Sequence, residues 1–127
     1  MSPAGVGQTT LFATRPTMTF PNDLLFDKQQ RLFVSDPSSC SLFTVQPNGR
    51  VAKWLSDPLL KGDRKFCPPA NLPLDIGAND TVFDKNDTSL FVANTDRASI
   101  IRVPIMKDGS AGKPELFVGL DCRNLKS

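Results

Sequence analysis

The sequence predicts an all-β protein built from two consecutive four-stranded antiparallel units. The stretch that begins with Asn22-Asp23 returns 57 positions later, at Asn79-Asp80 (79 − 22). A second stretch, Leu32-Phe33-Val34, returns 58 positions later as Leu90-Phe91-Val92 (90 − 32). The 11 prolines and 8 glycines interrupt short runs of Val, Leu, Ile, Phe and Thr, and no window sustains a helical period. A repeat at a nearly fixed spacing indicates units that bury their apolar faces against one another.

The first unit, residues 20–57, contains four predicted strands separated by turn residues. The strands cover residues 24–27, 31–36, 41–46 and 51–55. The last turn, Pro47-Asn48-Gly49, is a strong hairpin signal because Asn and Gly adopt the positive φ angles that tight turns need. The first unit therefore has the alternation of short strands and turns that an antiparallel sheet requires.

The second unit, residues 77–119, repeats this plan. Its predicted strands cover residues 81–84, 89–94, 99–105 and 114–118. Its third turn, Lys107-Asp108-Gly109, matches the corresponding turn of the first unit in kind. The two units thus share strand number, strand order and turn chemistry.

Three segments flank or join the units. In the N-terminal segment, residues 1–19, we predict an isolated strand over residues 9–14, the outer strand of a preceding unit. Residues 58–76 form a Pro-rich connection, which is either a functional loop or a surface insertion. Residues 120–127 form a C-terminal tail.

Four-stranded antiparallel units in tandem are what the blades of a β-propeller require. A propeller removes its edge strands only by closing its ring, and two blades cannot close. We therefore expect a partial β-propeller of two blades, completed by self-association, in which three copies give six blades, or by a partner chain. Otherwise four flanking apolar residues face water: Leu24, Phe26, Val82 and Phe83. Five phenylalanines are better explained by packing between blades than by a ligand cage: Phe12, Phe33, Phe43, Phe91 and Phe117.

Composition and charge exclude several classes of partner. A length of 127 residues favours one domain, and the 15 basic residues lie among 13 acidic ones for a net charge of +2. Because the basic residues form no stripe, we expect neither nucleic-acid nor membrane-surface binding. No apolar run approaches the roughly 20 residues that cross a bilayer. The first seven residues lack a basic start and an apolar core, so we expect a cytoplasmic protein unless the chain is a piece of a longer precursor.

The absence of histidine excludes Ser-His-Asp and Cys-His catalysis and imidazole-based zinc sites within this chain. The three cysteines, Cys40, Cys67 and Cys122, fit no metal-binding spacing and are best interpreted as free, partly buried thiols. A disulfide between Cys40 and Cys67 stays an open alternative. The triplets that begin at Asn79 and Asn86 match the N-glycosylation pattern, and Asn86 is the more exposed candidate because it lies on a predicted hairpin tip.

Five motifs lie between about Phe20 and Val118: Phe20-Pro21-Asn22-Asp23, Leu32-Phe33-Val34-Ser35-Asp36, Ile76-Gly77-Ala78-Asn79-Asp80, Leu90-Phe91-Val92-Ala93-Asn94-Thr95 and Ile101-Arg102-Val103-Pro104-Ile105. Together they resemble the gluconolactonase, regucalcin and luciferin-regenerating-enzyme-like family, and in particular its sugar-lactone lactonase branch.

The resemblance implies a six-bladed propeller that hydrolyses sugar-type lactones with a divalent metal, commonly Ca²⁺, in its central channel. It implies that Asn79 is a metal ligand and that Asn22 contacts the substrate. No catalytic residue is assigned, because the family's Glu-bearing and base-bearing blades have no counterpart in this sequence. Asp80 also stands where the family usually has glycine.

The residues alone allow a second interpretation of these asparagines. Each Asn-Asp pair can simply shape the turn that enters an inner strand. Asp36 and Asn94, which end matching strands, can likewise line the channel or start the next turn. Two functions therefore stay open. The first is part of a metal-dependent lactone hydrolase without a complete active site. The second is a non-catalytic module whose strand edges recruit a partner, or a truncated product without independent activity.

Overall fold

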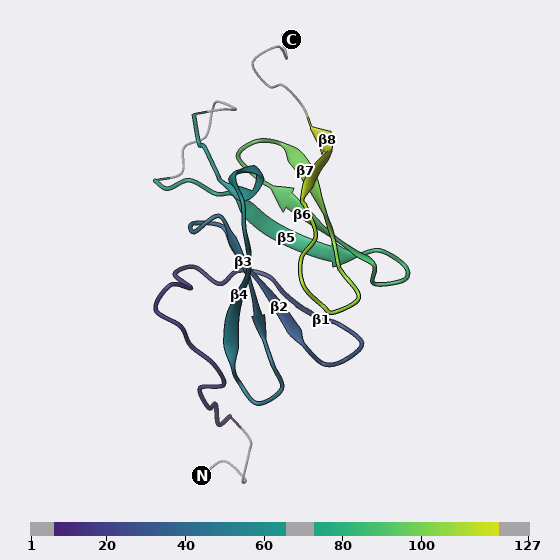
Figure 1. The fold of residues 1–127 in the computed structure, drawn as a ribbon. Helices are drawn as coiled ribbons and strands as arrows, with labels where there is room; N and C mark the ends of the chain where they lie inside the picture. Colours follow the sequence, from purple (N-terminus) through teal and green to yellow (C-terminus); the bar gives the residue numbers. More distant parts are fainter. Residues whose placement is uncertain (1–6, 66–72, 120–127) are drawn as a thin grey trace.

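The protein consists of two four-stranded antiparallel sheets, which we call sheet A and sheet B (Figure 1). The structure is a computed structural model that describes residues 7–65 and 73–119. Both sheets follow the order of the chain, and the short 3₁₀ helix η1 (Pro58–Leu60) follows sheet A. Sheet A contains β1 (Leu24–Phe26), β2 (Leu32–Asp36), β3 (Ser41–Val45) and β4 (Val51–Ser56). Sheet B contains β5 (Ala78–Phe83), β6 (Ser89–Asn94), β7 (Ser99–Pro104) and β8 (Glu115–Gly119). The predicted all-β fold with two four-stranded antiparallel units is confirmed.

The predicted strand over residues 9–14 is wrong. These residues adopt no strand, because a strand needs a hydrogen-bonded neighbour and no described segment pairs with them. Of the apolar residues in this range, Ala13 packs on the outer face of sheet A, where it and the nearby Met18 contact the cluster of Val34, Phe43 and Val45. Leu11 and Phe12 are exposed.

The internal repeat extends to the backbone conformation of the turns. Matching turns place a residue at positive φ in both units: Gln30 (67°) and Asp87 (56°), Cys40 (49°) and Ala98 (50°), Gly49 (88°) and Gly109 (87°). The register also shifts at matching points, between Leu42 and Phe43 in sheet A and between Ile100 and Ile101 in sheet B. The two units are therefore copies of one design in turns, bulges and strand order.

Ala98→Gly is expected to raise the free energy of unfolding by about 0.5–1 kcal/mol. The left-handed conformation costs an alanine about 1–2 kcal/mol, and the extra entropy lost by glycine offsets only part of this. The Ala98 side chain is exposed, so its removal leaves no cavity. Ala52→Gly, at an exposed position of β4 without positive φ, is the matched control and should destabilise. Urea denaturation of both variants measures the difference, and a destabilised Ala98→Gly protein would contradict this account.

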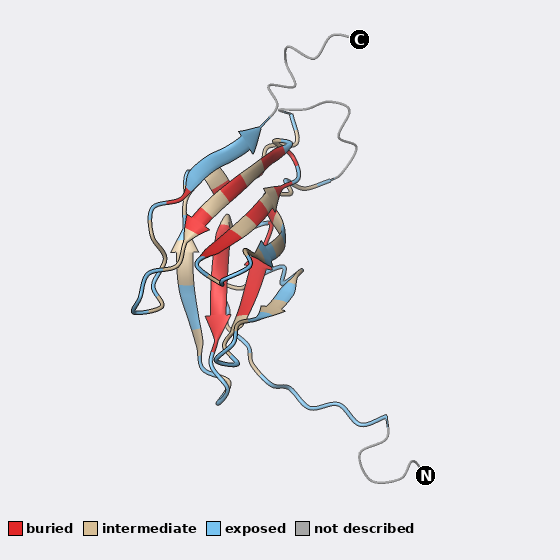
Figure 2. Cartoon of the chain, turned by 90° about the vertical axis from the view of Figure 1, so that its right-hand side faces the viewer, coloured by how far each residue is buried: buried red, intermediate tan, exposed pale blue. Residues whose placement is uncertain are grey.

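The main core lies between the two sheets. Sheet A contributes Phe33 and Leu42, and η1 contributes Leu60. Phe33 contacts Trp54 and Phe83 edge to face, with ring centroids 4.9 and 5.3 Å apart. Figure 2 shows buried residues running along the central strands of both sheets. Sheet B contributes Ala78, Leu90, Val92, Ile101 and Val103.

The remaining faces and edges of the sheets are partly uncovered. Leu24, Phe26 and Val82 are about 60% exposed, as predicted for blades without further neighbours. Phe83 differs from that prediction, because it is half-buried against Phe33. β8 is exposed along its whole length (Figure 2). Within the described residues, no helix has the length and apolar character needed to cross a membrane.

Candidate functional site

The structure brings Asn22 and Asn79 together where the two sheets meet. Asn22 lies two residues before β1, and its backbone amide donates to the Ser35 carbonyl at 3.0 Å. The Asn22 side-chain amide donates to Asn79 Oδ1, and Asn79 Nδ2 donates to Thr95 Oγ1 at 3.0 Å. The family resemblance implies a metal-ligand role for Asn79 and a substrate contact for Asn22, and the structure places both residues in one polar cluster with Thr95. Both asparagines retain access to solvent.

Asp23, the neighbour of Asn22, fastens sheet A to sheet B. Its Oδ2 accepts hydrogen bonds from the Thr81 amide at 2.7 Å and from the Thr81 hydroxyl at 2.8 Å. Ser35 adds a second link, because its hydroxyl donates to the Asn79 carbonyl. Sequence reasoning missed both links, and no motif in the sequence identifies the partner across the two sheets. These bonds hold the two asparagines in contact.

The described residues do not form a calcium site by themselves. Ca²⁺ requires six to eight oxygen ligands, with carboxylates among them. Asn79 Oδ1 already accepts from Asn22, and the adjacent carboxylate of Asp23 accepts from Thr81. Among residues 7–65 and 73–119, no group of three or more His, Cys, Asp or Glu side chains is arranged to hold a metal ion. The cluster therefore supplies neutral amide oxygens and lacks the carboxylates that a calcium ion needs.

Asp36 and Asn94 occupy matching strand ends, and each is buried and engaged in turn formation. Asp36 Oδ2 accepts from the Thr19 amide at 2.7 Å, and its Oδ1 accepts from the Ser38 hydroxyl at 3.0 Å. Burial alone would raise the pKa of the Asp36 carboxyl, but these donors hold the pKa below its usual value. Asn94 Nδ2 donates to the Leu59 and Lys61 carbonyls at 3.0 and 2.8 Å. Their partners fit the alternative in which both residues shape turns.

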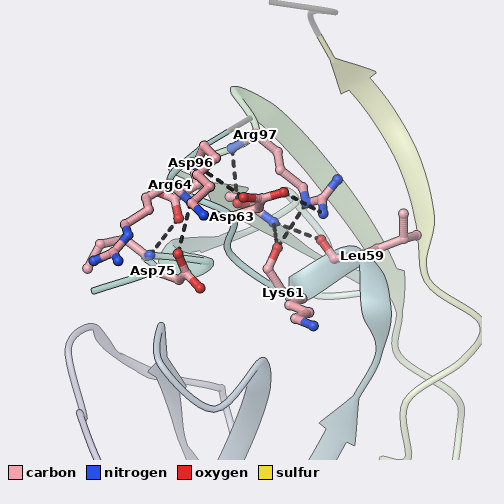
Figure 3. A network of polar contacts seen from close by, with 10 residues as sticks. Leu59, Lys61, Asp63, Arg64, Asp75, Asp96 and Arg97 are labelled. Atoms are coloured by element: carbon pink, nitrogen blue, oxygen red, sulfur yellow. Dashed lines mark hydrogen bonds and ion pairs between the residues drawn. The ribbon is translucent and has the colours of Figure 1, made fainter. Parts of the chain in front are cut away.

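A charged network surrounds the connection between the sheets (Figure 3). Asp96 is 6% exposed, and its Oδ2 accepts from the Ile76 amide at 2.7 Å. Burial raises the pKa of Asp96 above its usual value, and the nearby charge of Asp75 adds to this effect although the Ile76 amide opposes it. The carboxylate thus ties the start of sheet B to the turn between β6 and β7.

Two arginines complete the network of Figure 3. Arg97 Nε donates to the Lys61 carbonyl at 3.1 Å, and Arg97 Nη2 lies 3.9 Å from Asp63 Oδ2. The backbone amide of Arg64 donates to Asp75 Oδ1 at 3.0 Å. These contacts join the described parts of the connection to one another or to sheet B, and so they hold those parts of the chain in place.

A groove of about 560 Å³ lies at the opposite end of the sheets, among the hairpins that follow β1, β3, β5 and β7. Its polar groups bind one another: Arg31 Nη1 donates to the Gly109 carbonyl at 2.8 Å, and Arg31 pairs with Asp27 at 3.1 Å. Trp54 Nε1 donates to the same carbonyl at 2.8 Å. These bonds make the groove a seam between the sheets, in which one carbonyl receives two donors.

Of the predicted cysteine and glycosylation features, only some fall on described residues. Cys40 is a free, half-buried thiol, in agreement with the prediction. Cys67 and Cys122 lie outside the described residues, as does the C-terminal tail. Asn86 is exposed on the hairpin between β5 and β6.

A scan against protein-family models finds no family that matches the chain, and a search of curated proteins finds no match.

Proposed function

We propose that sheets A and B are two adjacent blades of a lactonase-like β-propeller and that the cluster of Asn22, Asn79 and Thr95 belongs to its lactone-binding end. The contact between Asn22 and Asn79 carries this proposal. The two residues lie 57 positions apart at matching points of a repeat, and each stands at the entry to an inner strand. Polar groups that converge from successive units at one end of a sheet stack are typical of ligand sites.

The cluster offers chemistry suited to an oxygen-rich, uncharged ligand. Side-chain amides donate to carbonyl and ring oxygens and accept from hydroxyls, which are the polar groups of a sugar lactone. Asn22 contacts the substrate in this proposal, and Asn79 contributes one neutral oxygen to a divalent cation, Ca²⁺ in the family that the chain resembles. The carboxylate ligands and the base for hydrolysis come from other blades, so sheets A and B alone are not a complete enzyme.

The uncovered faces of the two sheets favour a second candidate function, a non-catalytic interaction module. Leu24, Phe26, Val82 and Phe117 are all more than half exposed. Open strand edges recruit partners by strand addition, and uncovered apolar faces recruit them by burial. In this alternative the asparagine cluster shapes the inner strands and binds no lactone.

Calcium titration by calorimetry and a lactone-hydrolysis assay on the purified protein separate the two functions. The lactonase proposal expects calcium-dependent hydrolysis of a sugar lactone by the assembled protein. It also expects Asn79→Ala to lower turnover about 5- to 30-fold, since one lost ligand or hydrogen bond costs on the order of 1–2 kcal/mol. Asn86→Ala, on an exposed hairpin, is the matched control and should leave turnover unchanged. An assembled protein with neither calcium binding nor turnover would support the interaction module instead.

A further inference from the structure

The outer face of sheet B carries the same kind of aromatic pair as the face of sheet A that packs against sheet B. In sheet A, Phe33 meets Trp54 edge to face at 4.9 Å and 86°. In sheet B, Phe91, which lies 58 positions after Phe33 (91 − 33), meets Phe117 at 5.0 Å and 76°. Trp54 is the unpaired residue of β4 at the register shift between β3 and β4. Phe117 is the unpaired residue of β8 at the matching shift between β7 and β8. The two aromatic pairs are therefore the same structural feature in successive units.

These matching pairs differ in what covers them. The pair in sheet A is covered by sheet B, whose Phe83 contacts Phe33 at 5.3 Å and 85°. Phe117 of the pair in sheet B is 61% exposed. Val82 and its counterpart Leu25 differ in the same way. Leu25 packs against the core between the sheets, while Val82 is 58% exposed. Sheet B thus presents a ready-made face for a further unit.

The chain also carries the complementary half of that interface. Phe26 lies 57 positions before Phe83 (83 − 26), at the matching place on β1. It is 59% exposed, and its neighbour on the same face, Leu24, is 60% exposed. Paired residues of adjacent strands share a face, so Phe26 and Leu24 lie on the outer face of sheet A with Leu32 and Val34.

We propose that a second copy of this chain docks head to tail, with the outer face of its sheet A on the outer face of sheet B. Phe26 of the incoming copy takes the place beside Phe91 and Phe117 that Phe83 takes beside Phe33. The contact continues the interface already present between sheets A and B. It is heterologous, so repetition closes a ring where the rotation per copy allows, and three copies supply six blades. This inference rests on the proposal that the sheets are successive blades, and it is independent of lactone chemistry.

The polar links of the existing interface have counterparts in the proposed one. Asp23 accepts from the Thr81 amide across sheets A and B at 2.7 Å. Its repeat counterpart, Asp80, is exposed, and the counterpart of the Thr81 amide is that of Leu24. Asp80 of one copy is therefore placed to accept from the Leu24 amide of the next. Asn79 of one copy is likewise placed to meet Asn22 of the next.

Residues 13–18 compete with the incoming copy for part of this surface. Ala13 and Met18 pack on Val34, Phe43 and Val45 of the outer face of sheet A. The counterparts of these three residues, Val92, Ile101 and Val103, belong to the core between the sheets. The N-terminal segment must therefore leave this face when a second copy docks. Met18→Ser, which weakens its packing, is expected to strengthen self-association, and Met18 needs no part in the docked interface.

Analytical ultracentrifugation without calcium or lactone tests the proposal on the full chain. Phe26→Lys and Val82→Lys should each weaken self-association at least about tenfold, because either change places a charge in an apolar contact. An equimolar mixture of the two variants should form a complex of two chains and no larger, since it retains one intact pair of faces. Met106→Lys, at an exposed apolar residue on the hairpin after β7, is the matched control and should associate like the original protein.

Three results would overturn the proposal. Sensitivity to Val82→Lys alone would mean that sheet B pairs with another sheet B. Association unaffected by both lysine variants would place the contact elsewhere. A chain that stays monomeric up to about 1 mM, both unaltered and with Met18→Ser, would exclude specific association of this kind. An associating protein without lactone turnover would instead contradict only the lactonase proposal.

Discussion

Gly77→Ala is expected to lower the free energy of unfolding by about 3 kcal/mol, at the upper end of the cost of overpacking. A Cβ atom at Gly77 would lie 2.1 Å from the Leu60 carbonyl oxygen and 2.5 Å from the Gly62 backbone nitrogen. These neighbours are backbone atoms, which cannot rotate away. Gly77 itself is held on both sides, because its amide donates to the Pro37 carbonyl at 2.9 Å and its carbonyl accepts from the Thr95 amide at 3.2 Å.

Gly119→Ala is the matched control for this prediction. A Cβ atom there would lie 3.1 Å from Leu116 Cδ1, the end of an exposed and flexible side chain. Neither Gly77 nor Gly119 has a positive φ, so the comparison isolates the effect of space from that of backbone strain. Chemical denaturation of both variants measures the difference. Equal stability of the two would show that the chain crossing at Gly62 and Gly77 is looser than this structure has it.

The strands and turns were predictable because their signals are local. The Asn48-Gly49 and Asp108-Gly109 turns both reach positive φ at the glycine, as their chemistry requires. The prediction of a strand over residues 9–14 was wrong because the local sequence does not show whether a pairing strand lies beside the segment. Whether an apolar segment becomes a strand depends on a neighbour with free backbone groups, and no described strand pairs with residues 9–14.

The candidate site was predictable only as far as the repeat reaches. The repeat puts Asn22 and Asn79 at matching positions of the two units, and in the structure their side chains are in contact. The bond from Thr81 to Asp23 was not predictable, because the reach of a side chain to a neighbouring sheet depends on how the sheets twist and pack. The close approach of Gly62 and Gly77 was not predictable either, because a single glycine adds nothing to the hydrophobic periodicity of a sequence.

Phe33→Ala is expected to cost about 3–5 kcal/mol of unfolding free energy. Phe33 is 1% exposed and lies between Trp54 of its own sheet and Phe83 of the other sheet. Arg31 also lies over its ring, with the guanidinium carbon 4.6 Å from the centroid. Truncation therefore removes the edge-to-face contact between Phe33 and Phe83 of sheet B and leaves a cavity between the sheets. A domain of this size has a total stability of about 5–15 kcal/mol, so the variant should unfold at a much lower urea concentration than the original protein.

Phe91→Ala separates the fold of the single chain from its proposed assembly. Phe91 is the repeat counterpart of Phe33, but its partner Phe117 is exposed, and neither sheet of the described residues covers the pair. In the dissociated chain its removal should cost only about 1 kcal/mol, the size of one aromatic pair. At concentrations where copies associate head to tail, the loss of unfolding free energy in Phe91→Ala should rise toward that in Phe33→Ala. The loss in Phe33→Ala should be the same at both concentrations. Denaturation at two protein concentrations measures both, and equal costs in dilute protein would mean that the outer face of sheet B is already buried.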